Sequence, residues 1–410
     1  MNHRDNIFLL NGNSGKNIAY APLSDVAIIT DAAIVNELSD SEWDRLLAPE
    51  IAVYKTVLHP DGLTNLMILP NNKCNFHCSY CFSAQGRGHD ELSIEKMEAG
   101  IRYFFSPQRL SGKKATLSIL GGGEPLISWG LVKRAIELAE RVYAENGNGK
   151  LNISIVSNCS LVDDKFIAFC KVHGVYVTAS FDILEDVQNK QRSQYTRVQN
   201  NIVKLTEAGI KVDITAVITK DSVSRQKEMI EHIIDTVPAV SRVSFRYVLS
   251  ETYYKDARDR DQYYKDFINQ FFIAQTKAEE FGIELTCPYQ NLMTVPVDRH
   301  CPGKFVITPT GHISTCFCVS SPKEKHFDEF VFGDIGQDGI IHLDGDRLNT
   351  ILNCNKNTRE ECKTCPAQWH CAGGCYSDNI FMDKEEREAY CRSMRYYLYK
   401  YLIKKHKLTI

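Results

Sequence analysis

The chain has 410 residues, of which 43 % are hydrophobic and 24 % charged, and its formal net charge is −3. This length suits two or three domains, and the composition is that of an ordinary globular protein. So small a net charge gives no reason to expect nucleic acid or an anionic membrane as a partner. No run of roughly 18 apolar residues is present, and residues 7–10 are too short for the core of a signal peptide. The sequence therefore predicts a cytoplasmic protein without a membrane partner.

The unusual feature of the composition is its 15 cysteines. Because the cytosol is reducing, a disulfide framework is not expected there, and thiols at tight spacings point to metal ligation instead. Three of the cysteines lie within residues 74–81 and nine within residues 301–391. Metal sites are therefore expected in these two regions. Cys159, Cys170 and Cys354 are expected to be buried thiols without a ligand role.

Residues 1–62 contain short β-type runs followed by a helical stretch, which is the pattern of a small α+β segment. The runs are residues 7–10, Asn17–Ala21 and Val26–Thr30, and the helix is expected over residues 32–38. Such a segment is too short for a large core of its own. We expect it to pack against the barrel predicted for the residues that follow.

Residues 63–284 alternate β-type runs with helical patterns. Six strand–helix units in succession predict an α/β fold with a parallel sheet, either a barrel or an open arc, covered by helices on its outer face. Ligands then belong at the carboxyl ends of the strands. The strands are expected over residues 65–70, 115–120, 151–157, 175–181, 211–218 and 242–249. The helices are expected over residues 93–105, 129–146, 163–172, 194–208, 224–235 and 256–281.

Residues 285–410 form a third region, rich in cysteine, glycine and aromatic residues, without a helical period until Lys384. A terminal helix is expected over residues 386–405. A group of cysteines precedes it at the spacings C-x2-C-x5-C-x3-C, with one more cysteine after a further 15 residues. From spacing alone, two tight pairs would suit zinc as well as an iron–sulfur cluster. These cysteines are Cys362, Cys365, Cys371, Cys375 and Cys391.

The same region contains a predicted β-hairpin, with strands over residues 304–308 and 312–315 joined by the turn Pro309-Thr310-Gly311. Residues whose numbers sum to about 617–619 are expected to face one another across it. Cys301 and Cys316 would then lie side by side at the base of the hairpin, close enough to share one metal cluster.

Directly after the first barrel strand comes Cys74-Asn75-Phe76-His77-Cys78-Ser79-Tyr80-Cys81. Three thiolates on so short a loop can hold three irons of a cubane cluster, which normally takes four cysteines. One iron then keeps an open position, which distinguishes a catalytic metal from a structural one. A zinc site completed by His77 or a distant residue is the alternative from spacing alone.

This loop, with aromatic Tyr80 before its last cysteine, resembles the signature of the radical S-adenosylmethionine (SAM) superfamily. The resemblance implies a partial (β/α)6 barrel and a [4Fe–4S] cluster held by Cys74, Cys78 and Cys81. In that superfamily the open iron binds SAM, and one electron cleaves SAM to the 5′-deoxyadenosyl radical, which removes a hydrogen atom from the substrate. Tyr80 would lie against the adenine.

The turn Gly121-Gly122-Gly123-Glu124-Pro125 follows the second barrel strand and resembles the GGE motif of the same superfamily. Glycines let the backbone approach a ligand closely, and a carboxylate accepts bonds from an ammonium group. The resemblance therefore implies that Gly122 and Gly123 border SAM and that Glu124 holds its amino group.

Polar residues follow the next two strands. Ser157 and Asn158 are suited to ribose hydroxyls, and Cys159 stands where the superfamily often has glycine. Arg192 matches an arginine with which some relatives pair the SAM carboxylate, and a surface arginine is the alternative. Asp182 is a cavity candidate without an assigned role.

The C-terminal cysteines match the layout of the SPASM extension of radical SAM enzymes, C-x9-G-x4-C followed by C-x2-C-x5-C-x3-C and a final cysteine. The resemblance implies two auxiliary clusters, and hence three [4Fe–4S] clusters in all. The first auxiliary cluster would be held by Cys301, Cys316 and Cys375, and the second by Cys362, Cys365, Cys371 and Cys391. The fourth ligand of the first cluster is left open between Cys287, Cys318 and no residue.

SPASM enzymes act mostly on peptides or proteins, so the resemblance implies a maturase that forms a thioether, a carbon–carbon crosslink or another modification in a ribosomally made precursor peptide. Flavodoxin or ferredoxin is implied as the low-potential electron donor. Sulfatase-maturating enzymes carry aspartate directly after the cysteine equivalent to Cys316, where this chain has Phe317. That activity, a radical SAM dehydrogenase for a small molecule and a non-catalytic electron carrier are the alternatives.

The N-terminal residues 1–62 would then be a packing cap or a reduced leader-peptide-binding element. In the second case, Asn17–Ala21 and Val26–Thr30 would offer an edge to which an extended leader adds a strand.

Overall fold

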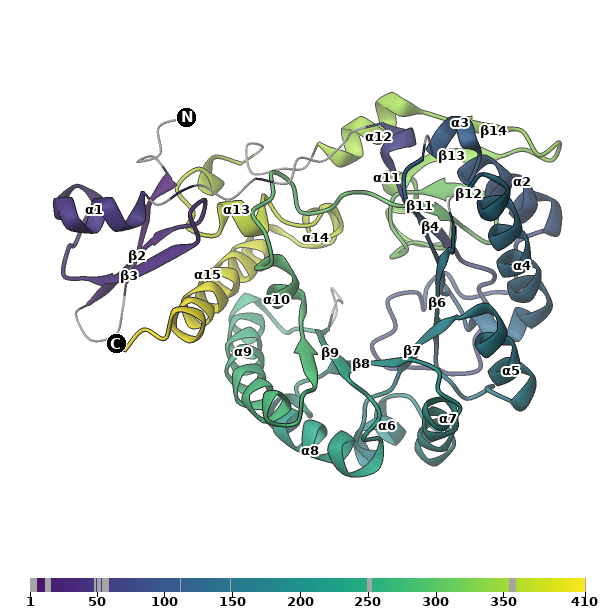
Figure 1. Ribbon diagram of the computed structural model, residues 1–410, viewed down its shortest axis with the longest axis horizontal. Helices are drawn as coiled ribbons and strands as arrows, with labels where there is room; N and C mark the ends of the chain where they lie inside the picture. Colours follow the sequence, from purple (N-terminus) through teal and green to yellow (C-terminus); the bar gives the residue numbers. More distant parts are fainter. Residues whose placement is uncertain are drawn as a thin grey trace.

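The described part of the structure, a computed structural model, contains two β-sheets, one of three strands and one of eleven. In Figure 1 the large sheet curves into an arc with helices along its outer side. The small N-terminal sheet lies outside this arc, at the left-hand side of the view. No helix in the described ranges is both long and apolar enough to span a bilayer. The residues described are 6–11, 16–47, 49, 53, 59–110, 112–147, 149–248, 253–353 and 359–409.

The six parallel strands expected from the sequence are present, side by side in chain order. Each begins and ends within two residues of its prediction, although Leu249 of the last one lies outside the described residues. The predicted α/β partial barrel is therefore confirmed. These strands are β4 (Asn65–Ile68), β5 (Thr116–Ile119), β6 (Asn152–Ser157), β7 (Tyr176–Ser180), β8 (Val212–Ile218) and β9 (Arg242–Tyr247).

Two further strands extend the parallel part of the sheet to eight. Strand β10 (Glu284–Thr286) pairs with β9, and β11 (Phe305–Ile307) pairs with β4 at the other end. The extra pairing was not expected, because strands of three residues are too short to show a period in the sequence. Three antiparallel strands continue from β11, so the C-terminal region shares one sheet with the barrel. They are β12 (His312–Ser314), β13 (Val331–Ile335) and β14 (Ile341–Leu343).

Strands β11 and β12 form the predicted hairpin, but with a different register. Val306 faces Ser314 and Ile307 faces Ile313, so paired numbers sum to 620 rather than 617–619. Thr308 N donates to His312 O (3.0 Å), so these two residues close the predicted three-residue turn and fix the sum of the paired numbers at 620. Gly311 closes the turn with φ of 87°, a conformation that favours glycine.

Helices cover the outer face of the arc, and their apolar sides face the strands. In α4, for example, the buried residues recur at helical spacing. The six predicted helices are confirmed within two residues, and the short α3 and α6 are additional. They are α2 (Ile94–Phe104), α3 (Pro107–Leu110), α4 (Trp129–Glu145), α5 (Asp164–His173), α6 (Glu185–Gln191), α7 (Tyr195–Glu207), α8 (Gln226–Thr236) and α9 (Ala257–Glu280).

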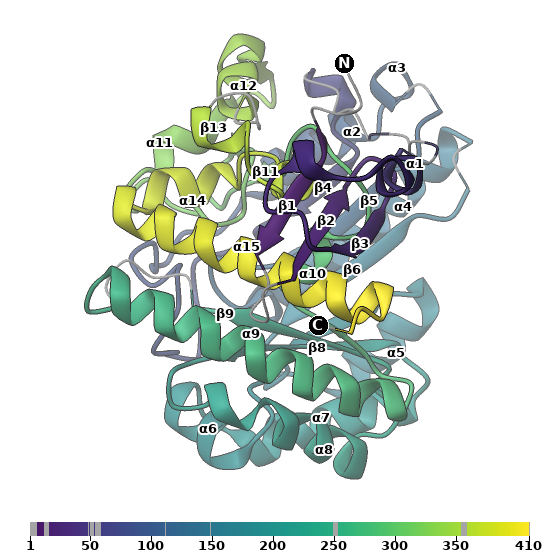
Figure 2. The same ribbon diagram turned by 90° about the vertical axis from the view of Figure 1, so that its left-hand side faces the viewer.

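The terminal helix α15 (Lys384–His406) is confirmed, and it begins with a capping box between Asp383 and Glu386. It packs along α9, as Figure 2 shows. Between residue 285 and Lys384, where the sequence has no helical period, the described residues include helices of four to eight residues, which are too short to show one. They are α10 (Pro288–Leu292), α11 (Phe327–Phe330), α12 (Gly345–Leu352), α13 (Gln368–Cys371) and α14 (Tyr376–Phe381). Single 3-10 turns occur at Val35–Glu37, Pro60–Gly62, Pro125–Ser128, Val223–Arg225 and Glu360–Cys362.

The N-terminal sheet has the antiparallel order β1-β2-β3, with β1 at Phe8–Asn11, β2 at Asn17–Ala21 and β3 at Val26–Thr30. The helix expected over residues 32–38 is wrong: the described helix is α1 (Asp40–Leu46). The helix starts later because Ser39 and Glu42 form a capping box.

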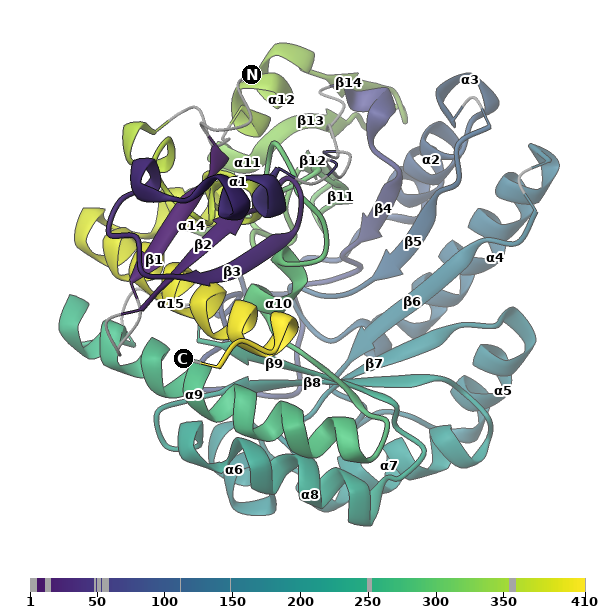
Figure 3. The same cartoon turned by 60° about the vertical axis from the view of Figure 1, so that its left-hand side comes forward.

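This small sheet packs against the C-terminal region rather than the barrel expected from the sequence. The buried hydroxyl of Tyr20 on β2 is 2.7 Å from His370 Nε2, and Trp369 Nε1 donates to Asn6 Oδ1 (2.9 Å). Figure 3 shows β1–β3 beside α15, which contacts β3. The N-terminal segment thus reaches the residues that immediately precede Cys371.

Candidate active site

The cysteine loop follows β4 and is bonded to the glycine turn that follows β5. Asn71 Nδ2 donates to Glu124 O (3.1 Å) and Ser128 Oγ (2.9 Å), while Asn71 Oδ1 accepts from Lys73 N (2.8 Å). Glu124 N in turn donates to Lys73 O (2.7 Å). A Cβ atom on Gly123 would lie 1.9 Å from Lys73 O, so only glycine fits this approach. The two sequence motifs therefore form one structural unit at the carboxyl ends of adjacent strands.

The three thiols of Cys74, Cys78 and Cys81 lie together, partly buried, beside a guanidinium group. Arg87 donates through Nη2 to Cys81 Sγ (3.4 Å) and through Nη1 to Phe76 O. Burial lowers the pKa of its guanidinium, but the three thiols raise it further than burial lowers it. Burial raises the pKa of the Cys74 and Cys78 thiols, and nearby arginines oppose this rise. Sequence reasoning missed Arg87, whose only signal was a basic residue between two glycines shortly after the last cysteine.

Glu124 is a buried carboxylate, 2 % exposed, that accepts three hydrogen bonds. Its Oε1 accepts from Ser157 Oγ (2.7 Å) and Leu126 N (3.1 Å), and its Oε2 accepts from Asn158 N (2.8 Å). Burial raises the pKa of this carboxyl, and the three bonds oppose the rise. Because Oε2 accepts one bond only, it keeps a lone pair. A buried carboxylate of this kind is suited to an ammonium group.

Ser157 and Asn158 follow β6 and face Glu124 and the cysteine loop. The Ser157 hydroxyl is used by Glu124, and Asn158 Nδ2 donates to Asn75 Oδ1 (2.9 Å). Cys159 adopts φ of 58°, the left-handed conformation that favours glycine. The turn in which the superfamily often has glycine is thus present here with a buried cysteine.

Tyr80, Asp182 and Arg192 form a network inside the barrel. The Tyr80 hydroxyl donates to Asp182 Oδ2 (2.5 Å) and accepts from Arg192 Nη1 (3.0 Å), while Asp182 Oδ1 accepts from Val217 N (3.0 Å). Asp182 is fully buried, and burial raises its pKa while Arg192 opposes the rise. The alternative that Arg192 is a surface residue is wrong, because its guanidinium packs against Tyr80 and over the ring of Phe76 (5.9 Å).

The C-terminal cysteines line two separate cavities, in the same two groups that the resemblance implied. Cys301, Cys316 and Cys375 border one cavity, and the other is bordered by the remaining four, Cys362, Cys365, Cys371 and Cys391. Gly374 borders both, so the two cavities adjoin. Lys304, which sequence reasoning also missed, lies next to the first cavity, where the thiols raise the pKa of its ammonium against the effect of burial.

The surroundings of these thiols suit an iron–sulfur cluster. Gly303 N donates to Cys301 Sγ (3.4 Å) and Cys318 N donates to Cys316 Sγ (3.5 Å). Such bonds favour the thiolate, which is the form that binds metal.

The segment after Cys316 covers the mouth of the barrel. The Phe317 ring lies 6.3 Å from that of Phe82, which directly follows Cys81. A Cβ atom on Gly122 would lie 2.4 Å from Ser320 Oγ, so this turn also needs glycine. The first auxiliary cavity therefore borders the same mouth as the cysteine loop, a proximity between residues more than 200 positions apart that no sequence pattern indicated.

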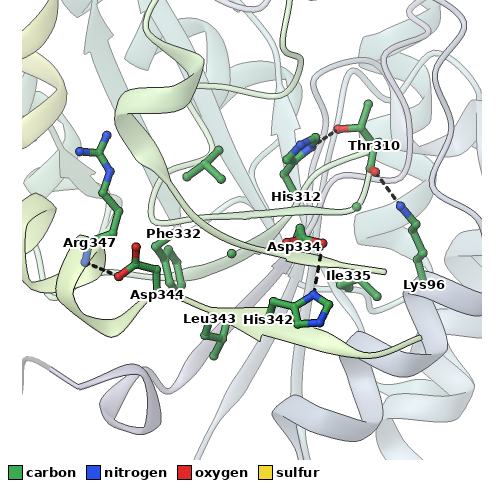
Figure 4. Close-up of a pocket in the computed structure, with 13 residues that line it drawn as sticks. Lys96, Thr310, His312, Phe332, Asp334, Ile335, His342, Leu343, Asp344 and Arg347 are labelled. Carbon is green, nitrogen blue, oxygen red and sulfur yellow. Dashed lines mark hydrogen bonds and ion pairs between the residues drawn. The ribbon is translucent and has the colours of Figure 1, made fainter. Parts of the chain in front are cut away.

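A further cavity of about 500 Å³ lies among β12, β13, β14, α2 and α12, and none of the residues that line it is a cysteine (Figure 4). Its polar groups bond to one another: Lys96 Nζ donates to Thr310 O (3.1 Å), and His342 pairs with Asp334 (3.6 Å). We assign it no function.

Fold and site together define an α/β partial barrel that carries a three-cysteine loop on its first strand. Residues 68–233 match the family described as the Radical SAM superfamily, so this part of the chain is a radical SAM domain and the predicted resemblance is confirmed. The family implies an enzyme that uses SAM and a [4Fe–4S] cluster.

The relatives and solved structures that match most of the chain include the following three. The radical SAM cyclopropyl synthase TigE of Paramaledivibacter caminithermalis is 24 % identical over 361 residues, which cover 79 % of this chain and 72 % of TigE. The cysteine-type anaerobic sulfatase-maturating enzyme of Clostridium novyi is 19 % identical over 362 residues, 78 % of this chain and 92 % of that enzyme. Streptococcus suis SuiB, solved with its precursor peptide SuiA, has a TM-score of 0.56 at 16 % identity and covers 93 % of this chain and 97 % of its own. At that identity, the match with SuiB establishes a shared fold.

Proposed function

We propose that the protein is a radical SAM peptide maturase of the SPASM type, which removes a hydrogen atom from a ribosomally made precursor peptide and forms a crosslink or related modification. The observation that carries this proposal is the meeting of the cysteine loop, the glycine turn and the first auxiliary cavity at one barrel mouth. Two similar proteins support it, since one is named a cyclopropyl synthase and the other was solved with its precursor peptide.

In this proposal Cys74, Cys78 and Cys81 hold the SAM-binding cluster, which together with SAM supplies the radical that starts the reaction. Glu124 would receive the amino group of SAM through the free lone pair of its Oε2. Arg192 would pair with the SAM carboxylate, and its bond to Tyr80 holds the guanidinium in place. Asp182 holds the Tyr80 hydroxyl and so positions the loop residue next to Cys81.

Sulfatase maturation is the second candidate, and the similarity to the Clostridium novyi enzyme favours it. The two candidates differ at the barrel mouth. Phe317 follows Cys316 here, and its ring packs beside Phe82 and 5.5 Å from Lys304 Nζ. The phenyl ring of phenylalanine has no group that can accept a proton, so the aspartate role expected of sulfatase-maturating enzymes is not filled by Phe317.

The test uses anaerobically purified full-length protein with SAM and a chemical reductant. Methionine and 5′-deoxyadenosine should be released, and a short peptide encoded beside the gene should lose mass equal to two hydrogens for each bond formed. A sulfatase-derived cysteine peptide serves as the parallel substrate. Conversion of that peptide alone would replace the maturase proposal with sulfatase maturation, and no SAM cleavage at all would leave an electron carrier.

We also propose that the leader of the precursor binds at the N-terminal sheet. The expectation that Asn17–Ala21 offers an edge is wrong, because it forms the central strand β2, whereas β1 and β3 lie at the two edges. Of these, β3 contacts α1 and α15, so we assign the leader to β1, where an added strand would gain main-chain hydrogen bonds.

Deleting the N-terminal segment is an unsuitable test, since Tyr20 bonds to His370 next to Cys371 and truncation would disturb the second cysteine cavity. Hydrogen exchange avoids this problem. Addition of full-length precursor should slow amide exchange in residues 8–11, and precursor lacking its leader should not. Equal exchange with and without leader would mean that this sheet is a packing cap.

A further inference from the structure

The first auxiliary cavity presents three thiols, whereas a cubane cluster normally takes four cysteines. From the sequence, the fourth ligand was left open between Cys287, Cys318 and no residue. The structure separates them, because the two thiols lie in different surroundings.

Cys287 belongs to the packing of the terminal helices. It is fully buried and caps α10, with its Sγ accepting from Gln290 N (3.5 Å). The other groups that act on its thiol are Tyr289, the Tyr397 hydroxyl and Arg246. None of these is one of the cysteines that border the auxiliary cavities.

Cys318 is two residues from Cys316, which borders the first cavity, although Cys318 is not itself among the residues that line it. It follows the β11–β12 hairpin in a turn, and its amide donates to Cys316 Sγ (3.5 Å). Its thiol contacts the thiol of Cys316, and Cys375 is the next cysteine that acts on it. Of the three thiols that border the cavity, Cys316 is thus its direct neighbour, and Cys375 acts on it through charge alone.

Lys304 gives an independent indication, because its ammonium identifies the thiols gathered at this place. It lies just before β11. Burial lowers the pKa of its ammonium, but the pKa is raised overall by four nearby thiols, those of Cys301, Cys316, Cys375 and Cys318. The ammonium also lies 5.5 Å from the centre of the Phe317 ring, between Cys316 and Cys318. A partly buried ammonium beside these four thiols would offset the negative charge that they carry once they bind a metal as thiolates.

We propose that Cys318 is the fourth thiolate of the first auxiliary cluster, so that Cys301, Cys316, Cys318 and Cys375 ligate it completely, and that Lys304 is its counter-charge. This inference rests on the proposed function, and it adds a consequence. A cluster with four protein thiolates has no open iron and cannot bind the peptide directly, so it serves to transfer electrons.

The test compares Cys318→Ala and Cys318→Ser with Cys287→Ala as the matched control and Cys316→Ala as the positive reference, all as anaerobically purified full-length protein. Iron content and electron paramagnetic resonance are the readouts. Both Cys318 variants should lose about four irons per chain or, after mild oxidation, show a [3Fe–4S] signal that the Cys287 variant lacks. Thermal unfolding of each variant identifies any that fails to fold, and the serine variant then decides.

Unchanged iron content and spectra in both Cys318 variants would overturn the inference, and so would iron loss in the Cys287 variant. Absence of the auxiliary cluster itself is distinguishable, because the Cys316 variant would then also retain the iron content of the wild type. Failure of the proposed peptide reaction is distinguishable as well, because it would appear in the peptide assay and leave these differences in iron content intact. Lys304→Met should keep the iron and shift the midpoint potential of this cluster to a more negative value, since removing a positive charge disfavours the reduced state. An unchanged potential would remove Lys304 from the proposal.

Discussion

Replacing Glu124 with glutamine tests the SAM-binding assignment most directly. In the wild type, Ser157 Oγ, Leu126 N and Asn158 N converge on the carboxylate. The glutamine amide must place its NH2 group against one of the two backbone donors. One buried N–H then has no acceptor, and the free energy of unfolding should fall by roughly 1–3 kcal/mol.

The effect on SAM is separate from this loss of stability. A charge-assisted bond to the SAM ammonium contributes roughly 1.5–3 kcal/mol, so Glu124→Gln should weaken SAM binding by about one to two orders of magnitude. Burial raises the pKa of Glu124 above its ordinary value of 4.5, so the folded protein binds this proton at a higher pH than the unfolded chain. Ionisation of Glu124 therefore lowers the free energy of unfolding as the pH rises towards the pKa of the folded protein. Wild-type SAM affinity should fall as the pH is lowered through that same pKa, because a protonated carboxyl no longer attracts the ammonium group. The glutamine variant should lack this part of the pH dependence.

Isothermal titration of SAM into cluster-replete protein measures the affinity, with iron content determined on the same samples. Glu98→Gln is the matched control, because it removes a carboxylate from a surface pair with Arg134 (2.6 Å), where we expect an effect below about 1 kcal/mol. If Glu124→Gln binds SAM like the wild type while its unfolding temperature falls, the residue only holds the turn and the assignment is refuted.

Three other outcomes are expected. Anaerobically purified protein should hold on the order of 12 irons per chain, and alanine at the three loop cysteines should leave about eight and abolish SAM cleavage, whereas iron near four or stoichiometric zinc would contradict the three-cluster assignment. Arg87→Met removes the positive charge beside Cys81 and should make the loop cluster harder to reduce in a potentiometric titration, with exposed Arg102→Met as control; equal midpoint potentials would remove this role. Tyr20→Phe leaves His370 without its hydroxyl partner and should lower the free energy of unfolding by roughly 1–3 kcal/mol in denaturant titrations, and no change would mean that this contact does not stabilise the protein.

The sequence by itself determined the succession of strands and helices in the barrel and the cysteine motifs placed upon it. Each of those elements is longer than three residues and has an apolar pattern of its own, as in α4 and β8, so local information was enough. The cysteine spacing was informative for a related reason, since ligands on one short loop are held close together by the chain itself.

Tertiary structure alone decided how distant segments meet. Strand β11 is three residues long and its place beside β4 depends on pairing across more than 200 residues, which leaves no local pattern. The same holds for Phe317 beside Phe82, and for the difference between Cys287 and Cys318, two thiols that no sequence feature separated. Arg87 and Lys304 became recognisable only when their charges were seen to lie among thiols, because the sequence gives the number of charges but not their neighbours in space.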